Sequence, residues 1–309
     1  MGTGGWGNPM TIPVSRRRFL AGLGATAVAG SSVSAFGRHL ADTTSMRVGY
    51  AAITWGGDDE RAAREIAEVG FTAIQVRGSA FERYGKAPGE LKDLLARHKL
   101  TFAVLSSGNL GIDPAKESSE LAMHLEHAKF LRAAGGRTLQ IIDERPKRPL
   151  VAADYARLGK LLTAVGRSTA ELGVETVYHH HMNSIGEKPQ EVDAVLEAID
   201  PKAVGILFDI AHYQQGGGDP VAAIRRYRDR IKVVHLKDVR AIDKAPGFEW
   251  VELGRGRVDV KGCVAALKEI GFKGWAIIEL DKVPDPTGSP KASALLNKQY
   301  ATEQLGLSL

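Results

Sequence analysis

Residues 175–209 read ETVYHHHMNSIGEKPQEVDAVLEAIDPKAVGILFD and contain two kinds of pattern. The apolar run over 175–181 predicts a strand, the amphipathic run that begins at Pro189 predicts a helix, and a second apolar run ends at Asp209. Two strands joined through a helix form a βαβ unit, in which the strands lie parallel. This stretch therefore predicts an α/β fold built on a parallel sheet.

The same alternation occurs eight times between Met46 and the end of the 309-residue chain. Proline near the predicted helix starts and glycine just past the ends, as at Gly70 and Gly173, support the boundaries. The predicted strands are 47–53, 72–77, 101–106, 138–142, 175–181, 204–209, 232–237 and 275–279. The predicted helices are 58–69, 87–99, 114–134, 152–172, 189–199, 220–229, 261–270 and 291–305.

Eight βα units in about 265 residues match a (β/α)₈ TIM barrel, which we predict as a single domain over residues 41–309. A doubly wound open sheet shares the alternation, but it more often carries a glycine-rich phosphate turn after its first strand. The corresponding turn here, over 54–59, reads TWGGDD and lacks the G-x-G-x-x-G spacing. The barrel is therefore the predicted fold.

The first forty residues have the pattern of an export signal. Arg16, Arg17 and Arg18 precede Phe19 and Leu20, and a small, mildly apolar run follows over 21–35. A basic segment, an apolar segment and a small-residue exit are typical of a signal peptide, and the paired arginines indicate the twin-arginine pathway. The run is broken by glycines and is short for a membrane span. We predict a signal and linker over 1–40, a periplasmic protein, and no membrane association after export.

Charge and cysteine content narrow the function classes. The formal net charge is +5, and without Arg16, Arg17 and Arg18 it falls to about +2, which argues against a nucleic-acid partner. Cys263 is the single cysteine, so an intrachain disulfide framework and a cysteine-rich zinc site are excluded. Its surroundings predict an amphipathic helix, in which Cys263 is a small core residue.

Four late strands end in side chains that can bind a metal ion. These are His179, Asp209, His235 and Glu279. Each has a plain alternative explanation when taken alone: Asp209 could cap a turn, and Glu279 could pair with Lys237 or Arg240. In a barrel, however, the carboxyl ends of the strands meet at one mouth, where active sites lie. Four such residues on successive strands therefore predict a site for one divalent metal ion.

The ligand set bears on the identity of this ion. Two imidazoles and two carboxylates suit Mn²⁺, Co²⁺, Fe²⁺ or Zn²⁺. Mg²⁺ is less favoured because it prefers oxygen ligands.

Longer motifs around these residues carry a resemblance to a known family. The motifs are YHHHM over 178–182, FDIAH over 208–212, DRIKVVHLKDVR over 229–240, GRGRVD over 254–259 and GWAIIE over 274–279, with a weaker match over 54–59. The chain resembles the sugar phosphate isomerase/epimerase family of xylose isomerase-like TIM barrels, and within it most closely the inosose dehydratases. The resemblance covers nearly the whole chain after the leader.

The resemblance implies roles for individual residues. It places the metal ion on His179, Asp209, His235 and Glu279. It places His181 and His212 where the family contacts substrate, and it leaves Lys237 or Arg240 to bind an oxyanion or hydroxyl.

Two positions depart from the family pattern. Many epimerase members have a glutamate where His179 stands, and their two glutamates act as acid and base on opposite faces of the sugar. Only Glu279 remains here, which favours the dehydratase-like branch. Gln75 stands where that branch is expected to have a glutamate. Asp143 and Glu144 are spare carboxylates whose orientation the sequence leaves open.

The expected chemistry is proton removal next to the carbonyl of a keto-sugar or inosose. Glu279 or His181 takes the proton, and His212 returns it or protonates a departing hydroxyl. A sugar isomerase/epimerase-like reaction is the main expectation. The alternative is a dehydratase, or lyase, of an inosose, another keto-cyclitol or a keto-glycoside.

Two further functions rank lower. An abasic-site endonuclease needs more metal ligands and a basic groove for the phosphate backbone. A non-catalytic sugar-binding barrel would leave His181 and His212 without a role. The expected partner is thus a small-molecule sugar or cyclitol and no nucleic acid, while the sequence leaves homo-oligomer formation open.

Overall fold

The computed structural model of the chain describes residues 1–2 and 46–309. The predicted signal and linker therefore lies outside the described residues, apart from Met1 and Gly2. In the part that is described, no helix combines the length and the apolar character that crossing a bilayer requires.

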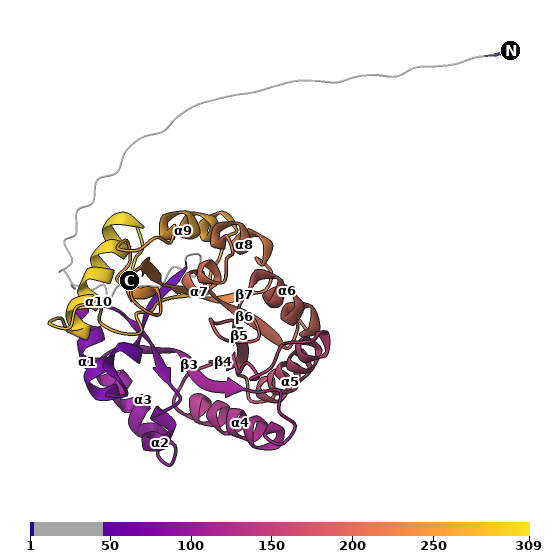
Figure 1. Cartoon of the computed structure of the whole chain (residues 1–309), viewed down its shortest axis with the longest axis horizontal. Coiled ribbons are helices and arrows are strands. Elements are labelled where there is room, and N and C mark those ends of the chain that lie inside the picture. Colours follow the sequence, from indigo (N-terminus) through magenta and orange to yellow (C-terminus); the bar gives the residue numbers. More distant parts are fainter. Residues whose placement is uncertain (3–45) are drawn as a thin grey trace. The chain divides into compact units, whose positions relative to one another are not determined.

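Eight parallel strands close into a barrel in the order β1-β10-β7-β6-β5-β4-β3-β2, which confirms the predicted TIM barrel. Figure 1 shows the helices arranged around the ring of strands. The strands are near-continuous apolar runs because both of their faces are buried. Their bounds are β1 (Arg47–Ala51), β2 (Ala73–Arg77), β3 (Thr101–Leu110), β4 (Thr138–Asp143), β5 (Glu175–His179), β6 (Val204–Asp209), β7 (Ile231–Leu236) and β10 (Trp275–Ile278).

The helices begin and end largely where the cap residues predict. Asp58 accepts the backbone N–H of Arg61 at the start of α1, and Gly70 ends that helix in the left-handed region, with φ of 103°. The helices are α1 (Asp59–Val69), α2 (Ala80–Tyr84), α3 (Pro88–Arg97), α4 (Glu117–Ala133), α5 (Ala152–Ala170), α6 (Pro189–Ala198), α7 (Ile210–Gln215), α8 (Pro220–Arg226), α9 (Val260–Glu269) and α10 (Pro290–Gln299). Short helical turns η1 (Ala52–Trp55) and η2 (Tyr300–Gln304) follow β1 and α10.

Several short elements differ from the predicted ones. The fifth strand ends at His179 rather than at residue 181, and the third continues to Leu110. The helices α2 and α7 were not predicted, because five or six residues are too few to show a helical period. A two-stranded antiparallel hairpin, β8 (Asp238–Ala241) with β9 (Phe248–Val251), stands between β7 and α9 and was also not predicted.

A layer of small and branched side chains fills the inside of the barrel. These are Ala51, Ala73, Ala103, Val104, Val177, Leu207, Val233 and Ile277. Side chains along a strand alternate between the two faces, so the residue two positions further on also points inward. That rule places Gln75, His179, Asp209, His235 and Glu279 in the next layer toward the mouth. The packing of the barrel interior therefore builds the site.

A polar cluster is buried between β3 and α4, outside the barrel interior. The hydroxyl of Ser107 lies 2.7 Å from Nδ1 of His124 and 2.9 Å from Nδ1 of His127. Nε2 of His124 lies 3.2 Å from the carbonyl oxygen of Asn109. Burial, together with the neighbouring His127, lowers the pKa of His124 to about 4. Both imidazoles are therefore neutral in the folded protein at pH 7.

The cluster makes the free energy of unfolding depend on pH. The folded-state pKa of His124 lies below its unfolded value of 6.5, so the unfolded chain binds more protons between these values. Stability is then complete above about pH 6.5 and is lost as the pH falls toward 4, by up to about 3 kcal/mol for this residue. Urea unfolding at pH 7 and 4.5, with a chelator present, should show a smaller loss in His124→Gln than in the wild type. An equal loss in both proteins contradicts this assignment.

Candidate metal centre

Four side chains meet at the carboxyl-terminal mouth of the barrel. His179 ends β5, Asp209 ends β6, His235 lies in β7, and Glu279 follows β10 by one residue. All four are buried, with exposed fractions of 7% or less. Each offers one donor atom, and these atoms all lie within 4.8 Å of one another.

The spacing of the donor atoms fits a single bound ion. Nδ1 of His235 lies 3.3 Å from both Asp209 Oδ2 and Glu279 Oε1. Ligands held by bonds of about 2.1 Å around a tetrahedral ion are separated by about 3.4 Å. His179 Nδ1, Asp209 Oδ2 and His235 Nδ1 are buried and have no hydrogen-bond partner among the described residues. Unpartnered buried polar atoms are costly, so the donor set fits a divalent cation.

Gln75 orients two of these side chains. Its Oε1 lies 3.0 Å from Nε2 of His235, and its Nε2 lies 3.3 Å from Oε2 of Glu279 and 3.1 Å from Oε1 of Gln140. Because the amide must donate to the carboxylate, its oxygen accepts from the Nε2–H of His235. In the neutral form of His235, which metal binding requires, the lone pair then sits on Nδ1 and faces the centre.

Asp209 has two roles at once. Its Oδ1 accepts the backbone N–H groups of Ala211 and His212, both at 2.9 Å, and so caps the start of α7. Its Oδ2 is the atom left unpartnered. The cap considered from the sequence is therefore present, and it fixes the carboxylate with one oxygen free.

Lys237 compensates the negative charge of the site. Its Nζ lies 3.1 Å from Glu279 Oε1 and 2.7 Å from Asp281 Oδ1, and it sits 4.5 Å from the centre of the Trp250 ring. Burial disfavours the ammonium form, but Asp281 and Glu279 outweigh this effect and raise the pKa of Lys237. Lys237 is thus a buried cation. The sequence left Lys237 and Arg240 as alternative partners of Glu279, and Lys237 makes the contact.

The protonation states favour binding of a cation. Burial and the nearby His235 and His181 hold the pKa of His179 well below its usual range, so this imidazole is neutral. Burial disfavours both carboxylates in their charged form, but His235 and Lys237 outweigh it and lower the pKa of Asp209 and of Glu279. Burial likewise opposes charging of His235, yet Glu279 and Asp209 raise its pKa to about 9. The pair of carboxylates thus attracts positive charge to the centre: a proton on His235 when no ion is bound, which a metal ion would replace.

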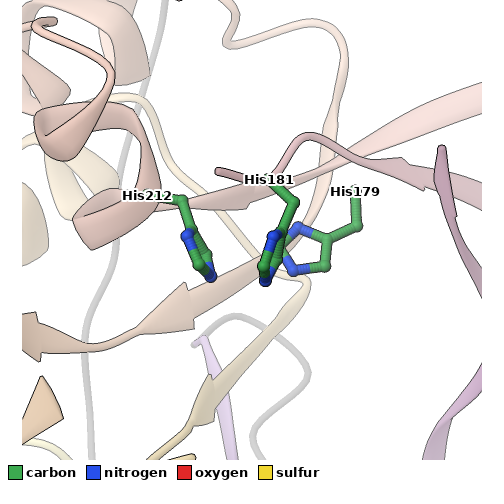
Figure 2. A group of neighbouring side chains, drawn as sticks. All are labelled: His179, His181 and His212. Atoms are coloured by element: carbon green, nitrogen blue, oxygen red, sulfur yellow. The ribbon is translucent and has the colours of Figure 1, made fainter. Parts of the chain in front are cut away.

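The next residues outward form the rim of the centre. Two positions beyond Gln75, His179, His235 and Glu279 stand Arg77, His181, Lys237 and Asp281. Nδ1 of His181 lies 2.7 Å from the carbonyl oxygen of Met182, so it carries the proton and donates it there. The lone pair of Nε2 is then free to act as a base. Figure 2 shows His181 between His179 and His212.

His212 lies behind His181 rather than at the surface of the mouth. The two ring centres are 3.7 Å apart, and His212 is 1% exposed on α7, not in a loop as predicted. Burial and the ammonium of Lys237, whose Nζ is 3.4 Å from Nε2, hold the pKa of His212 well below its usual range. A neutral, enclosed His212 fixes the position of His181, and its predicted contact with substrate stays a prediction.

A small cavity of about 110 Å³ opens onto the centre. Its walls are Ala51, Ile53, Gln75, Arg77, Ser106, Gln140, Ile142, His179, His181, Glu279 and Asp281. The sequence reasoning did not single out Arg77, Gln140 or Asp281. The signal was available, since Arg77 and Asp281 each follow an inward-facing residue by two positions.

Other carboxylates and cations considered from the sequence lie elsewhere. Arg240 is exposed on β8 and pairs with Glu249 at 2.7 Å, so it is not brought to the centre. Asp143 is buried and accepts the hydroxyl of Tyr178 at 2.7 Å. Glu144 lies 3.5 Å from Lys116. None of the three lines the cavity.

A TIM barrel with two imidazoles and two carboxylates buried at its carboxyl-terminal mouth has the layout of a metal-dependent barrel enzyme. A family model described as "Xylose isomerase-like TIM barrel" matches residues 63–299. The chain belongs to this family.

Known relatives agree with this placement. The chain is 28% identical over 295 residues to an inosose dehydratase of Lacticaseibacillus casei, covering 83% of this chain and 96% of that protein. A solved IOLI protein with a bound zinc atom aligns with a TM-score of 0.73 at 15% identity, over 85% of this chain and all of that one. An L-ribulose 3-epimerase aligns with a TM-score of 0.70 at 17% identity, over 85% and 95% of the two chains. The two structures show the shared fold.

The contacts of Gln75 predict its effect on metal binding. Gln75→Leu keeps the volume but removes both orienting hydrogen bonds, so the affinity for Zn²⁺ should fall by about 10- to 100-fold. Gln140→Leu is the matched control, because Gln140 accepts a hydrogen bond from Gln75 and has none with the four candidate ligands among the described residues. Competition against a chromophoric chelator measures both variants. A Zn²⁺ affinity of Gln75→Leu equal to that of the wild type contradicts the orienting role.

Proposed function

We propose that the chain is a divalent-metal-dependent dehydratase of an inosose or a related keto-sugar. It removes the proton from the carbon next to the carbonyl, and the hydroxyl on the following carbon leaves as water. The observation that carries this proposal is the four-donor centre with His181 beside it and Glu279 as its one glutamate.

The donor set supports dehydration over epimerisation. Epimerisation with two carboxylates needs a base on each face of the sugar, and His179 stands where the second carboxylate would be. Glu279 is held by Lys237 and Gln75 on its two oxygens, which limits its freedom to exchange a proton. The curated relatives are also named for dehydration. The isomerase/epimerase reaction expected first is therefore less well supported than the alternative.

The proposed roles follow from the contacts. A divalent ion, when bound by His179, Asp209, His235 and Glu279, supplies Lewis-acid polarisation of the substrate carbonyl. His181 takes the proton from carbon at its free Nε2 and delivers it to the departing hydroxyl. One carbon–hydrogen and one carbon–oxygen bond break, one carbon–carbon double bond forms, and water carries the proton away. Arg77 and Gln140 in the cavity wall can bind substrate hydroxyls.

We also propose that the protein is exported. The support is the arginine pair before an apolar run in the leader. A protein exported after folding takes up its ion in the cytoplasm, which gives the cell control over which metal is bound.

Proton exchange and loss of water test the reaction. The metal-loaded protein, incubated in D₂O with a panel of inososes, ketoses and keto-glycosides, should place deuterium beside the carbonyl of the reacting substrate or convert it to an enone, as seen by NMR. Exchange without loss of water would support the isomerase/epimerase reaction instead. Tight sugar binding with neither change would contradict enzymatic enolisation.

Replacement of the base gives a second test. His181→Gln should lower kcat by about 10²- to 10⁴-fold, because the base is lost. Its metal content should remain that of the wild type, since His181 is outside the four-donor centre. The matched control is His98→Gln, a histidine that follows α3 and lies outside the four-donor centre and outside the neighbouring group of His179, His181 and His212. Activity of His181→Gln within tenfold of the wild type would exclude it as the base.

A further inference from the structure

A second, larger cavity lies beside the metal centre. It has a volume of about 510 Å³ and is formed by the β8–β9 hairpin and the segment after Asp281. Its walls are mostly apolar and include Phe248, Trp250, Pro246, Val283, Pro284 and Pro286. The size falls within the range of about 300 to 1,000 Å³ typical of small-molecule sites.

Trp250 lies between the larger cavity and two residues beside the metal centre, His212 and Lys237. On one side its ring centre lies 4.8 Å from that of His212 and 4.5 Å from Nζ of Lys237. On the other side it packs 5.1 Å from Phe248 and lines the larger cavity. Phe248 and Trp250 share one face of β9, because they are two residues apart.

The segment at Asp281 and Lys282 runs alongside both cavities. Asp281 lines the small cavity and accepts from Lys237, and the next residue, Lys282, lines the large one. Residues that are adjacent in the chain therefore line the two cavities. The small cavity, at about 110 Å³, has room for the reacting part of a sugar and little more.

The hairpin is held in a fixed position beside the mouth. Asp238, buried at the start of β8, accepts backbone N–H groups from Val239, Gly254, Gly256 and Val258 at 2.8 to 3.0 Å. The cavity wall is thus anchored near the end of β7, which carries His235 and is followed by Lys237. A fixed aromatic wall is suited to stacking of a flat or apolar group.

We infer that this second cavity binds an aromatic or apolar substituent carried by the sugar ring, so that the substrate class is a keto-glycoside rather than a free inosose. The inference rests on the proposed function, because the sugar ring is taken to react at the metal centre. Phe248 and Trp250 offer ring faces to the substituent, and the prolines complete an apolar surface. The two lysines at the rim, Lys244 and Lys282, remain in contact with solvent.

The groove over β3 and β4 is a weaker candidate for the same role. Three of the four cations that line it are already paired: Arg145 with Glu191, Arg148 with Asp154, and Lys116 with Glu144. The cavity at the hairpin, by contrast, is lined by Trp250, which contacts Lys237 beside the metal centre.

A pair of unreactive probes tests the inference in the metal-loaded full chain. Phenyl β-glucoside and methyl β-glucoside differ only in the substituent, and their dissociation constants are measured by isothermal titration. We expect the phenyl compound to bind at least about tenfold more tightly, which corresponds to about 1.4 kcal/mol. Equal affinity, or no detectable binding of either compound, overturns the inference.

Variants locate the effect. Phe248→Ala and Val283→Asp should each abolish the preference for the phenyl compound, because one removes the ring face and the other adds a charge to the apolar wall. Leu295→Ala, an exposed apolar residue on α10, is the control and should keep it. Thermal unfolding shows which of the variants are folded. Each folded variant of the pair Phe248→Ala and Val283→Asp should have lost the preference for the phenyl compound. A preference that persists in both variants overturns the assignment.

The outcomes separate this inference from the proposed function. Deuterium exchange into an unsubstituted inosose, with no preference for the phenyl probe, removes the second cavity from substrate binding and leaves the dehydratase. A phenyl preference without deuterium exchange into any keto-substrate supports binding in the second cavity and contradicts the dehydratase. If Val283→Asp instead converts a dimer to a monomer in size-exclusion chromatography and the probes bind equally, the cavity is an interface between two copies and the inference is wrong.

Discussion

The alternation of side chains in a closed barrel forces charged groups into its interior. Val177, Leu207, Val233 and Ile277 fill one inner layer, and the residues two positions further on are His179, Asp209, His235 and Glu279. These side chains cannot turn toward solvent without changing the register of strands that are buried on both faces. The strands that stabilise the fold therefore also fix the geometry of the site, and they leave donor atoms that require a cation.

The surrounding residues make this arrangement tolerable. Lys237 balances Glu279 and Asp281, while α7 donates its first N–H groups to Asp209. Gln75 selects the tautomer of His235 in which Nδ1 faces the centre. A buried charge is destabilising unless it is paired and hydrogen-bonded, and each carboxylate here has at least one such partner. Three inward donor atoms, on His179, Asp209 and His235, have no hydrogen-bond partner among the described residues. Such atoms are the ones that a metal ion would bind.

The sequence was sufficient for the barrel and for bringing the four donors together, because each donor lies at or within one residue of the carboxyl end of an apolar strand. It was insufficient where short elements intervene. His212 was expected in a loop, but Asp209 caps the start of α7, and this helix buries His212. Arg240 was expected near the substrate, but the chain forms a hairpin after β7, and Arg240 lies exposed on its first strand. Gln75 looked only like a departure from a family pattern, and its role depends on contacts with residues more than a hundred positions away.

The metal content of a pair of matched variants tests the central claim most directly. Asp209 and Asp219 both cap helices through their side chains, but only Asp209 offers an oxygen to the centre. Elemental analysis should find about one divalent ion per chain in the wild type and in Asp219→Ala, and less than about a tenth of that in folded Asp209→Ala. Full occupancy in folded Asp209→Ala would contradict the account.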